Sequence, residues 1–210
     1  MAHIPDGVLS APVLTLGAVV TAGMLAVALR RLDDERLPQT AVLAATFFVA
    51  SLISIPLGPS SVHLLLNGLM GLLLGWMAVP ALFVALMLQA VFFGFGGLVV
   101  LGVNTMNLAL PALFCAAALR APLRRADPPQ AWLIGTLAGV AGVLLTGVAV
   151  ALSLALSGKP FVPAAKTLVV ISLPLAVVEG LITATIVSFL LRVAPELVFH
   201  TETNHDESHD

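Results

Sequence analysis

Residues 132–156 read WLIGTLAGVAGVLLTGVAVALSLAL, and this stretch contains no charged side chain. A helix that crosses a bilayer needs about 20 consecutive, predominantly apolar residues, so the stretch is long enough to do so. The rest of the chain has the same character, with 60% apolar and only 10% charged residues, whereas soluble domains carry about 25% charged residues. The sequence therefore predicts an all-α integral membrane protein.

Six further apolar runs are typical of membrane spans. We expect about seven transmembrane helices, at Leu9–Leu29, Gln39–Pro56, His63–Trp76, Pro80–Gly94, Asn104–Leu119, Trp132–Leu156 and Thr167–Leu191. The third and fourth are short and close together, so they form either a tight hairpin or one broken segment. We expect residues 1–197 to be a single transmembrane domain and the polar residues 198–210 to be a disordered cytoplasmic tail.

The basic residues are distributed unevenly between the expected loops. Two lysines lie between spans six and seven, whereas the arginines follow spans one, five and seven: Arg30, Arg31, Arg36, Arg120, Arg124, Arg125 and Arg192. Loops rich in Lys and Arg stay in the cytoplasm. We therefore expect the N-terminus outside and the C-terminus in the cytoplasm. The net charge of −2 offers no basic surface for nucleic acid.

Two histidines, His3 and His63, fall on the expected outer face. Histidine is the commonest metal ligand, and an ionisable residue within a membrane protein indicates a functional site. Taken singly, each histidine also fits a simpler interpretation, in which His63 binds a loop carbonyl and His3 is a solvated terminal residue. The convergence of the two residues on one face favours a transition-metal site.

The N-terminal nitrogen atoms extend this hypothesis. A free α-amine has a pKa of about 7.7–8.0, so it can lose its proton and ligate a metal near neutral pH. Removal of Met1 leaves the amine of Ala2, the amide nitrogen and imidazole of His3, and His63 as four nitrogen ligands. Retention of Met1 moves the amine one residue away, and His63 is then displaced or becomes an axial ligand. A tetragonal set of nitrogens favours Ni(II) or Cu(II).

Four polar residues are candidates for a supporting role around the metal: Asp6, Ser61, Asn104 and Asn107. Each also has an ordinary structural interpretation, which is a turn for Asp6, a helix cap for Ser61 and interhelical hydrogen bonds for the two asparagines. Glu179 is the one acid deep in an apolar run, and we expect it to bind a neighbouring helix or a partner subunit.

The opening His3-Ile4-Pro5-Asp6-Gly7 and the segment Ser61-Val62-His63-Leu64 resemble those of the NikM/CbiM family. Those proteins are the substrate-binding (S) components of energy-coupling-factor transporters for nickel and cobalt. The resemblance continues through the glycine-rich stretch that ends at Asn104 and reaches about Leu197. One departure is Ala2, which stands between the initiator methionine and the histidine.

The resemblance implies a seven-helix subunit of a bacterial or archaeal cytoplasmic membrane, without a cofactor, that binds Ni²⁺ in preference to Co²⁺ as its substrate. The implied partners are a membrane scaffold (T) subunit, separate ATPase (A) subunits and a small accessory membrane subunit. The chain has no P-loop sequence, so we do not expect it to be an enzyme. Two alternatives remain: an S component for a vitamin, and an intramembrane metal-dependent enzyme that uses His63 with Glu179.

Overall fold

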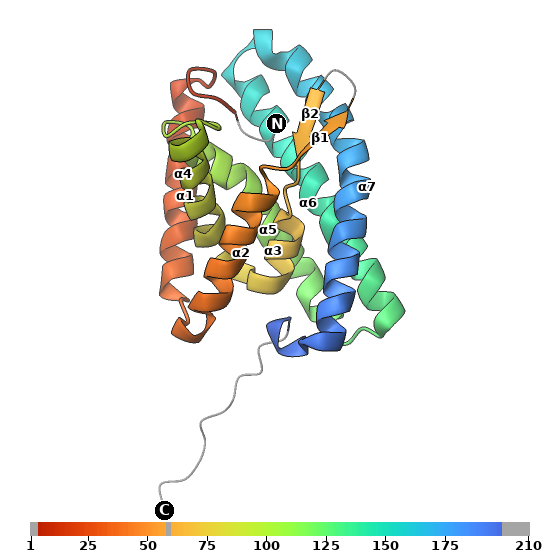
Figure 1. Ribbon diagram of the computed structural model, residues 1–210. Coiled ribbons are helices and arrows are strands. Elements are labelled where there is room, and N and C mark those ends of the chain that lie inside the picture. Colours follow the sequence, from red (N-terminus) through yellow and green to blue (C-terminus); the bar gives the residue numbers. More distant parts are fainter. Residues whose placement is uncertain (1–3, 58–59, 199–210) are drawn as a thin grey trace, which may run out of the picture.

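The computed structural model describes residues 4–57 and 60–198, and these residues are almost entirely helical. The helices run roughly parallel to one another as a bundle, and the two ends of the described chain lie at opposite ends of it (Figure 1). The α-helices are α1 (Ala11–Arg30), α2 (Leu37–Ala50), α3 (Asn67–Leu74), α4 (Ala78–Phe93), α5 (Leu101–Leu123), α6 (Pro128–Ser157) and α7 (Val162–Val193). Short 3-10 helices η1 (Asp34–Arg36), η2 (Gly75–Met77), η3 (Lys159–Phe161) and η4 (Pro195–Leu197) lie between or after them.

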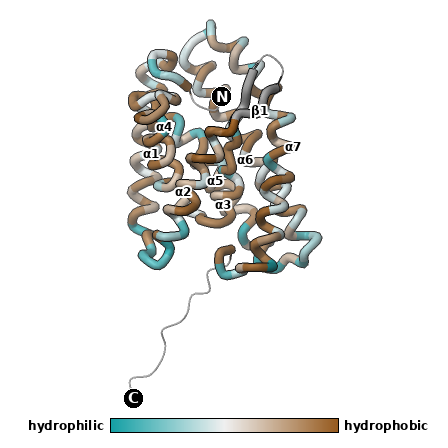
Figure 2. Tube along the Cα trace, in the orientation of Figure 1, coloured by the Kyte–Doolittle hydropathy of each residue, from teal (hydrophilic) through white to brown (hydrophobic). Residues whose placement is uncertain are grey.

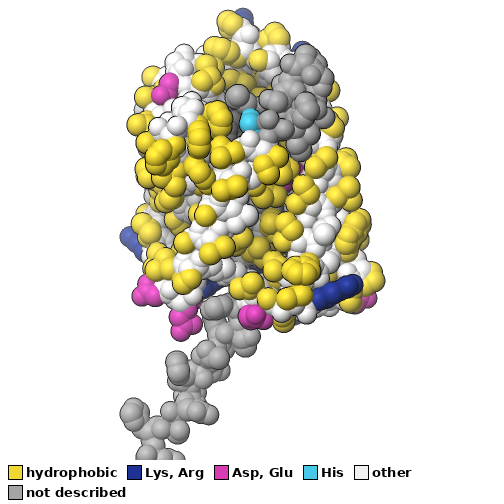
Figure 3. Space-filling model, in the orientation of Figure 1, with side chains coloured by type: hydrophobic (Ala, Val, Ile, Leu, Met, Phe, Trp, Pro, Cys, Tyr) yellow, Lys and Arg dark blue, Asp and Glu magenta, His cyan; other side chains and the backbone are white. Residues whose placement is uncertain are grey.

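Five segments of the described chain are long and apolar enough to cross a membrane. They are Ala11–Arg30, Asn67–Phe93, Leu101–Leu123, Pro128–Ser157 and Lys159–Val193. Apolar residues occupy the middle of the bundle in Figure 2, and large apolar side chains cover the face seen in Figure 3. Exposed side chains such as Val19 and Leu156, 71% and 69% exposed, are suited to contact with lipid rather than water. The chain is therefore a multi-pass membrane protein.

The second and third expected spans differ from the helices that form. Helix α2 ends at Ala50 after 14 residues, and α3 has only 8 residues and begins at Asn67. Between them lies an antiparallel hairpin of β1 (Ser54–Leu57) and β2 (Ser60–His63), which pairs Ser54 with His63. Pro56 lies within β1, six residues beyond the end of α2.

The third and fourth expected spans form a helical hairpin that turns at Gly75–Met77. Gly75 has a φ of +58°, a left-handed backbone conformation that glycine adopts at little steric cost. This residue ends α3 and starts η2, after which α4 begins at Ala78. Asn67–Phe93 is continuous by length and hydropathy. However, His63 before α3 and Phe95 after α4 lie in contact, so α4 returns toward the end of the bundle at which α3 begins, as in the hairpin alternative.

Helix α3 lies in the middle of the bundle, and all eight of its residues are buried. Its first residue, Asn67, is fully buried and donates from Nδ2 to the carbonyl of Leu108 on α5 and to Oγ1 of Thr146 on α6. A Cβ on Gly68 would lie 2.1 Å from the carbonyl oxygen of Ala138 on α6. The backbone of α3 therefore packs directly against its neighbours, which fixes the position of the hairpin that precedes it.

Candidate metal site

The start of the described chain is bound to the beginning of α5. Asn104 accepts a hydrogen bond from the N–H of Ile4 at Oδ1 and donates from Nδ2 to the carbonyl of Ile4, each at 3.1 Å. Both side chains are 3% exposed. Asn104 therefore fixes the main chain of the residue that directly follows His3 in the sequence.

The next contacts of the N-terminal segment are with the glycine-rich segment Gly94–Val100, between α4 and α5. The N–H of Asp6 donates to the carbonyl of Gly96 at 3.2 Å, and the Asp6 carboxylate accepts from the N–H of Val100 at 3.0 Å. A Cβ on Gly97 would lie 2.1 Å from the carboxylate of Asp6. Glycine at position 97 is therefore what allows the carboxylate to reach Val100.

The same glycine-rich segment also contacts the hairpin that carries His63. The ring of Phe95 lies 5.9 Å from the ring of His63, measured between centroids, with an angle of 46° between the planes. Gly94–Val100 thus touches the N-terminal segment through Gly96 and Val100, and His63 through Phe95. Two parts of the chain that are about sixty residues apart in sequence meet on one short segment.

His63 is the last residue of β2, and its ring is partly buried. Its Nδ1 atom is buried and has no hydrogen-bond partner among the described residues. Burial lowers the pKa of the imidazole from its ordinary value of 6.5, and the nearby main-chain carbonyl of Ser51 opposes this shift in part. The ring is therefore neutral at neutral pH, and neutral imidazole is the form that coordinates metals.

Glu179 on α7 holds the backbone that directly follows His63. Its carboxylate accepts hydrogen bonds from the N–H of Leu65 and from the N–H of Leu66, the latter 3.0 Å from Oε2. Glu179 is 1% exposed, and Leu66 has a φ of +45°, which is uncommon for a residue with a branched side chain. The carboxylate therefore fixes an irregular turn between β2 and α3.

The remaining candidates occupy different positions. Asn107 is buried one helical turn beyond Asn104, and its Oδ1 accepts from the hydroxyl of Ser153 on α6 at 3.2 Å. Ser61 pairs with Pro56 in the hairpin and so belongs to a strand rather than to a helix. Met1, Ala2 and His3 lie outside the described residues. Within the described part of the chain, no three His, Cys, Asp or Glu side chains lie close enough to hold a metal ion.

Two structural roles near the site were not expected from the sequence. Asn67 was not singled out, although a buried amide at the start of an apolar run is a signal in itself. The bonds from Leu65 and Leu66 to Glu179 join residues more than a hundred positions apart. Glu179 was expected to bind a neighbouring helix or a partner subunit, and it binds the turn between His63 and α3, including Leu66 at the N-cap of α3.

The chain is thus a helical membrane protein whose N-terminal segment is bound beside a partly buried histidine. Residues 3–197 match the family model described as the cobalt uptake substrate-specific transmembrane region, CbiM. The match covers nearly the whole chain, so the protein belongs to this family, whose members take part in nickel and cobalt transport.

Relatives along the full length agree with this assignment. A Haemophilus influenzae protein named for metal transport is 42% identical over 205 residues, which are 95% of this chain and 98% of the relative. The cobalt transport protein CbiM of Sorangium cellulosum is 30% identical, with 93% and 94% covered. The fused nickel transport protein NikMN of Rhodobacter capsulatus is 32% identical over 93% of this chain, which spans 63% of that longer protein.

A solved structure shares the fold. The crystal structure of a transition metal transporter superimposes with a TM-score of 0.73 at 26% sequence identity, and the match covers 91% of this chain and 93% of the other. The named relatives are transport proteins, and none of their names describes an enzyme.

Proposed function

We propose that this protein captures Ni²⁺ or Co²⁺, with a preference for Ni²⁺, as the substrate-binding subunit of an ATP-driven uptake transporter of the energy-coupling-factor type. The metal is bound by nitrogen atoms in a nearly square-planar arrangement. Its ligands are the N-terminal amine of Ala2, or of Met1 where that residue is retained, the amide and imidazole of His3, and the imidazole of His63. The ion is the transported substrate, and the protein needs no resident cofactor.

The meeting of the N-terminal segment and His63 on Gly94–Val100 carries this proposal. Asn104 and Asp6 hold residues 4–6 against α5 and the glycine-rich segment, and Phe95 in that segment contacts the ring of His63. The Nδ1 atom of the neutral His63 ring is buried and has no hydrogen-bond partner in the part of the chain that the structure describes. Depending on the tautomer, it can coordinate a metal ion through its lone pair or donate a proton. A ligand set that lacks carboxylates and thiolates favours the tetragonal nitrogen chemistry of Ni(II).

The charge distribution supports an orientation with this site outside the cell. Arg30, Arg120 and Arg192 lie in the last turns of α1, α5 and α7, whereas Lys159 and Lys166 lie between α6 and the body of α7. The positive-inside rule then puts the arginine-rich end in the cytoplasm. Seven crossings of the bilayer satisfy this arrangement, with α2 and α3 as the short ones.

Transport against a gradient requires partners in this proposal. The chain has no P-loop for ATP, so separate ATPase (A) subunits supply the energy and a membrane scaffold (T) subunit couples them to this protein. A small accessory membrane subunit completes the assembly.

The alternative functions have less support. An intramembrane hydrolase that uses His63 with Glu179 needs a free carboxylate, but Glu179 accepts the N–H groups of Leu65 and Leu66. A pocket for a vitamin is typically lined by hydrophobic and aromatic side chains. Aromatic residues are only 6% of this chain, which has no tyrosine.

Isothermal titration of Ni²⁺ and Co²⁺ into the purified protein tests the site. We expect His3→Ala and His63→Ala to weaken binding at least about tenfold, which corresponds to about 1.4 kcal/mol. Thr15→Ala is the control, because the Thr15 hydroxyl donates to the carbonyls of Ala11 and Pro12 within its own helix α1 and has no proposed role at the site. Affinities like those of the unmodified protein in both histidine variants would refute the assigned site.

Extension of the N-terminus by a few residues separates amine ligation from histidine ligation. If the terminal amine is a ligand, the extended protein binds Ni²⁺ as weakly as His3→Ala does. Unchanged binding after the extension would refute amine ligation and leave the histidines as the only assigned ligands. Mass analysis of the N-terminus then establishes whether Met1 or Ala2 carries the amine.

A further inference from the structure

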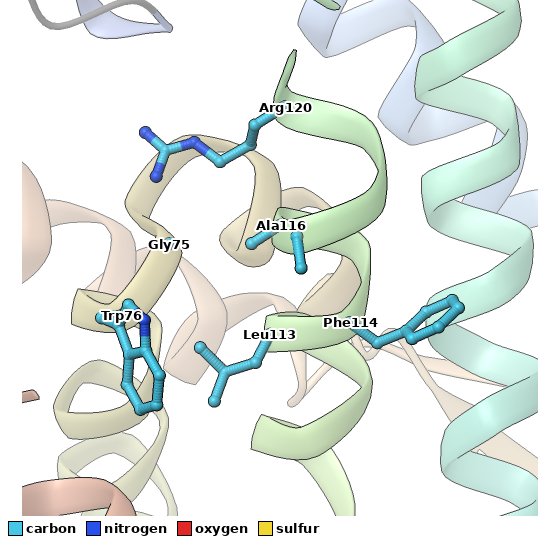
Figure 4. A pocket seen from close by; sticks show the side chains of 7 residues that line it. Gly75, Trp76, Leu113, Phe114, Ala116 and Arg120 are labelled. Atoms are coloured by element: carbon cyan, nitrogen blue, oxygen red, sulfur yellow. The ribbon is translucent and has the colours of Figure 1, made fainter. Parts of the chain in front are cut away.

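A cavity lies at the end of the bundle remote from His63, between η2 and α5. It encloses about 410 Å³ and is lined by Gly75, Trp76, Leu113, Phe114, Ala116, Ala117 and Arg120. Figure 4 shows Trp76 and Leu113 facing one another, with the Arg120 side chain extended above them over the turn at Gly75. The cavity therefore has apolar walls and one guanidinium at its end.

The apolar wall follows one face of α5 toward the bilayer. Leu113, Ala117 and Arg120 are four and three residues apart, so they succeed one another along the same side of the helix. Phe114 at the rim is 58% exposed, and α5 is one of the candidate membrane spans. The cavity thus opens on the surface that meets lipid, with Arg120 at the level where the helix ends.

The charged groups around Arg120 are mainly positive. The charged side chains that act on Arg120 are Arg36 and Arg124. Asp33 acts on Arg36, which itself donates to the carbonyl of Leu73 at the end of α3. Negative charge therefore compensates Arg36 and leaves Arg120 as the cation presented to the cavity.

Two contacts keep this arrangement in place. A Cβ on Gly75 would lie 2.2 Å from a terminal nitrogen of Arg120, so the absence of a side chain at position 75 lets the guanidinium lie on the turn. The guanidinium of Arg31 lies 4.9 Å from the centre of the Trp76 ring, a cation–π contact that fixes the opposite wall. The cavity is bounded by side chains with defined positions on both sides.

We propose that this cavity binds an anionic phospholipid, with the phosphate of its headgroup on Arg120 and the upper part of an acyl chain along Leu113, Ala117 and Phe114. Arginine is suited to phosphate because its planar guanidinium donates two parallel hydrogen bonds. Basic pockets between membrane helices bind acidic headgroups in the same way. The inference is independent of the metal site, which lies at the other end of the bundle.

Native mass spectrometry of the detergent-solubilised protein tests the proposal. The probes are phosphatidylglycerol and phosphatidylcholine with identical acyl chains, added in equal amounts. We expect phosphatidylglycerol to be retained at least about fivefold more, the selectivity of one basic residue near the membrane surface. Equal retention of the two lipids would overturn the proposal.

Variants locate the bound lipid. Arg120→Gln should abolish the preference for phosphatidylglycerol, and Ala117→Phe, which fills the cavity and keeps every charge, should reduce the retention of both lipids. Arg192→Gln is the control, because it removes a positive charge from α7, which contributes no residue to the cavity. The preference should persist in this control.

Three results would overturn the assignment to this cavity. The first is an unchanged preference for phosphatidylglycerol in Arg120→Gln, and the second is unchanged lipid retention in Ala117→Phe. The third is a loss of the preference in Arg192→Gln equal to that in Arg120→Gln, which would indicate a diffuse attraction of the lipid to the arginine-rich end. Nickel titration of the same variants should match that of the unmodified protein, which shows that they are folded.

Discussion

The side-chain amide of Asn104 binds the main chain of Ile4 on both sides, accepting from its N–H and donating to its carbonyl at 3.1 Å each. An asparagine is suited to this role because its amide offers one acceptor and two donors in a plane. Asn104 recognises the backbone of residue 4, whereas the Ile4 side chain is held by burial against Val100 and Val103. The N-terminal segment is therefore attached to α5 by hydrogen bonds between Asn104 and Ile4 that lie within an apolar layer.

Asn104→Ala should lower both stability and metal affinity. The substitution leaves the N–H and carbonyl of Ile4 buried without partners, at a cost of about 1–3 kcal/mol for each unsatisfied group. We expect a lower thermal unfolding temperature of the metal-free protein in detergent and a weaker Ni²⁺ titration. The affinity is the decisive measurement. A variant that unfolds at a lower temperature but binds Ni²⁺ with unchanged affinity would show that Asn104 stabilises the fold without supporting the metal site.

Gly97→Ala should displace the N-terminal segment through Asp6. The added methyl group would lie 2.1 Å from the Asp6 carboxylate, so either the carboxylate or the glycine-rich segment has to move. Gly94→Ala is the matched control, because position 94 also has a positive φ, +66°, but a Cβ there meets nothing within 4 Å. Ni²⁺ affinity should fall more in Gly97→Ala than in the control, and equal losses would assign the effect to backbone strain alone.

Glu179→Ala and Glu179→Gln should differ in severity. Alanine leaves the N–H groups of Leu65 and Leu66 without an acceptor, whereas glutamine keeps one acceptor oxygen for them. We expect Glu179→Ala to unfold at the lower temperature and to bind Ni²⁺ more weakly, because the turn it releases directly follows His63. Partial rescue of both quantities in Glu179→Gln is the expected signature, and equal behaviour of the two variants would contradict this role.

The metal-free protein should lose stability as the solution is acidified through the range in which His63 titrates. Burial lowers the folded-state pKa of His63 below its ordinary value of 6.5, so the unfolded state takes up the proton first. The stability associated with a neutral His63 is complete above about pH 6.5 and is lost as the pH falls toward the lowered pKa. Thermal unfolding at a series of pH values measures this slope.

His63→Gln provides the comparison for that series. Glutamine has no titrating group, so the variant should show a smaller decrease in unfolding temperature between about pH 7 and pH 5 than the unmodified protein. Parallel decreases in the two proteins would assign the acid sensitivity to groups other than His63.

The sequence predicts the membrane character of the chain because hydropathy reports the transfer of side chains into lipid. The long spans, in α1 and in α5 to α7, follow from uninterrupted apolar runs. The early end of α2 does not follow from hydropathy, because Leu52, Ile53 and Ile55 continue the apolar run beyond Ala50. The hairpin depends on backbone pairing from Ser54 with His63 to Leu57 with Ser60, which hydropathy does not report.

The candidate site is likewise only partly predictable from the sequence. His63, Asp6 and Asn104 are identifiable from residue type and expected position on one face. Their partners are not, because the contacts join distant segments: Asn104 meets Ile4 100 positions away, and Glu179 meets Leu65 114 positions away. Such pairs depend on how the helices pack, which a single sequence does not contain.

Among the described residues, four hydrogen bonds and the burial of Ile4 hold the N-terminal segment to the bundle. Two hydrogen bonds join Ile4 to Asn104, and two more join Asp6 to Gly96 and Val100. At about 0.5–1.5 kcal/mol each, they make local detachment of this segment far less costly than separation of the helices around it. In hydrogen exchange, the amides of Ile4 and Asp6 should therefore exchange long before those of α3, and access to His63 would be governed by a brief local opening while the bundle stays intact.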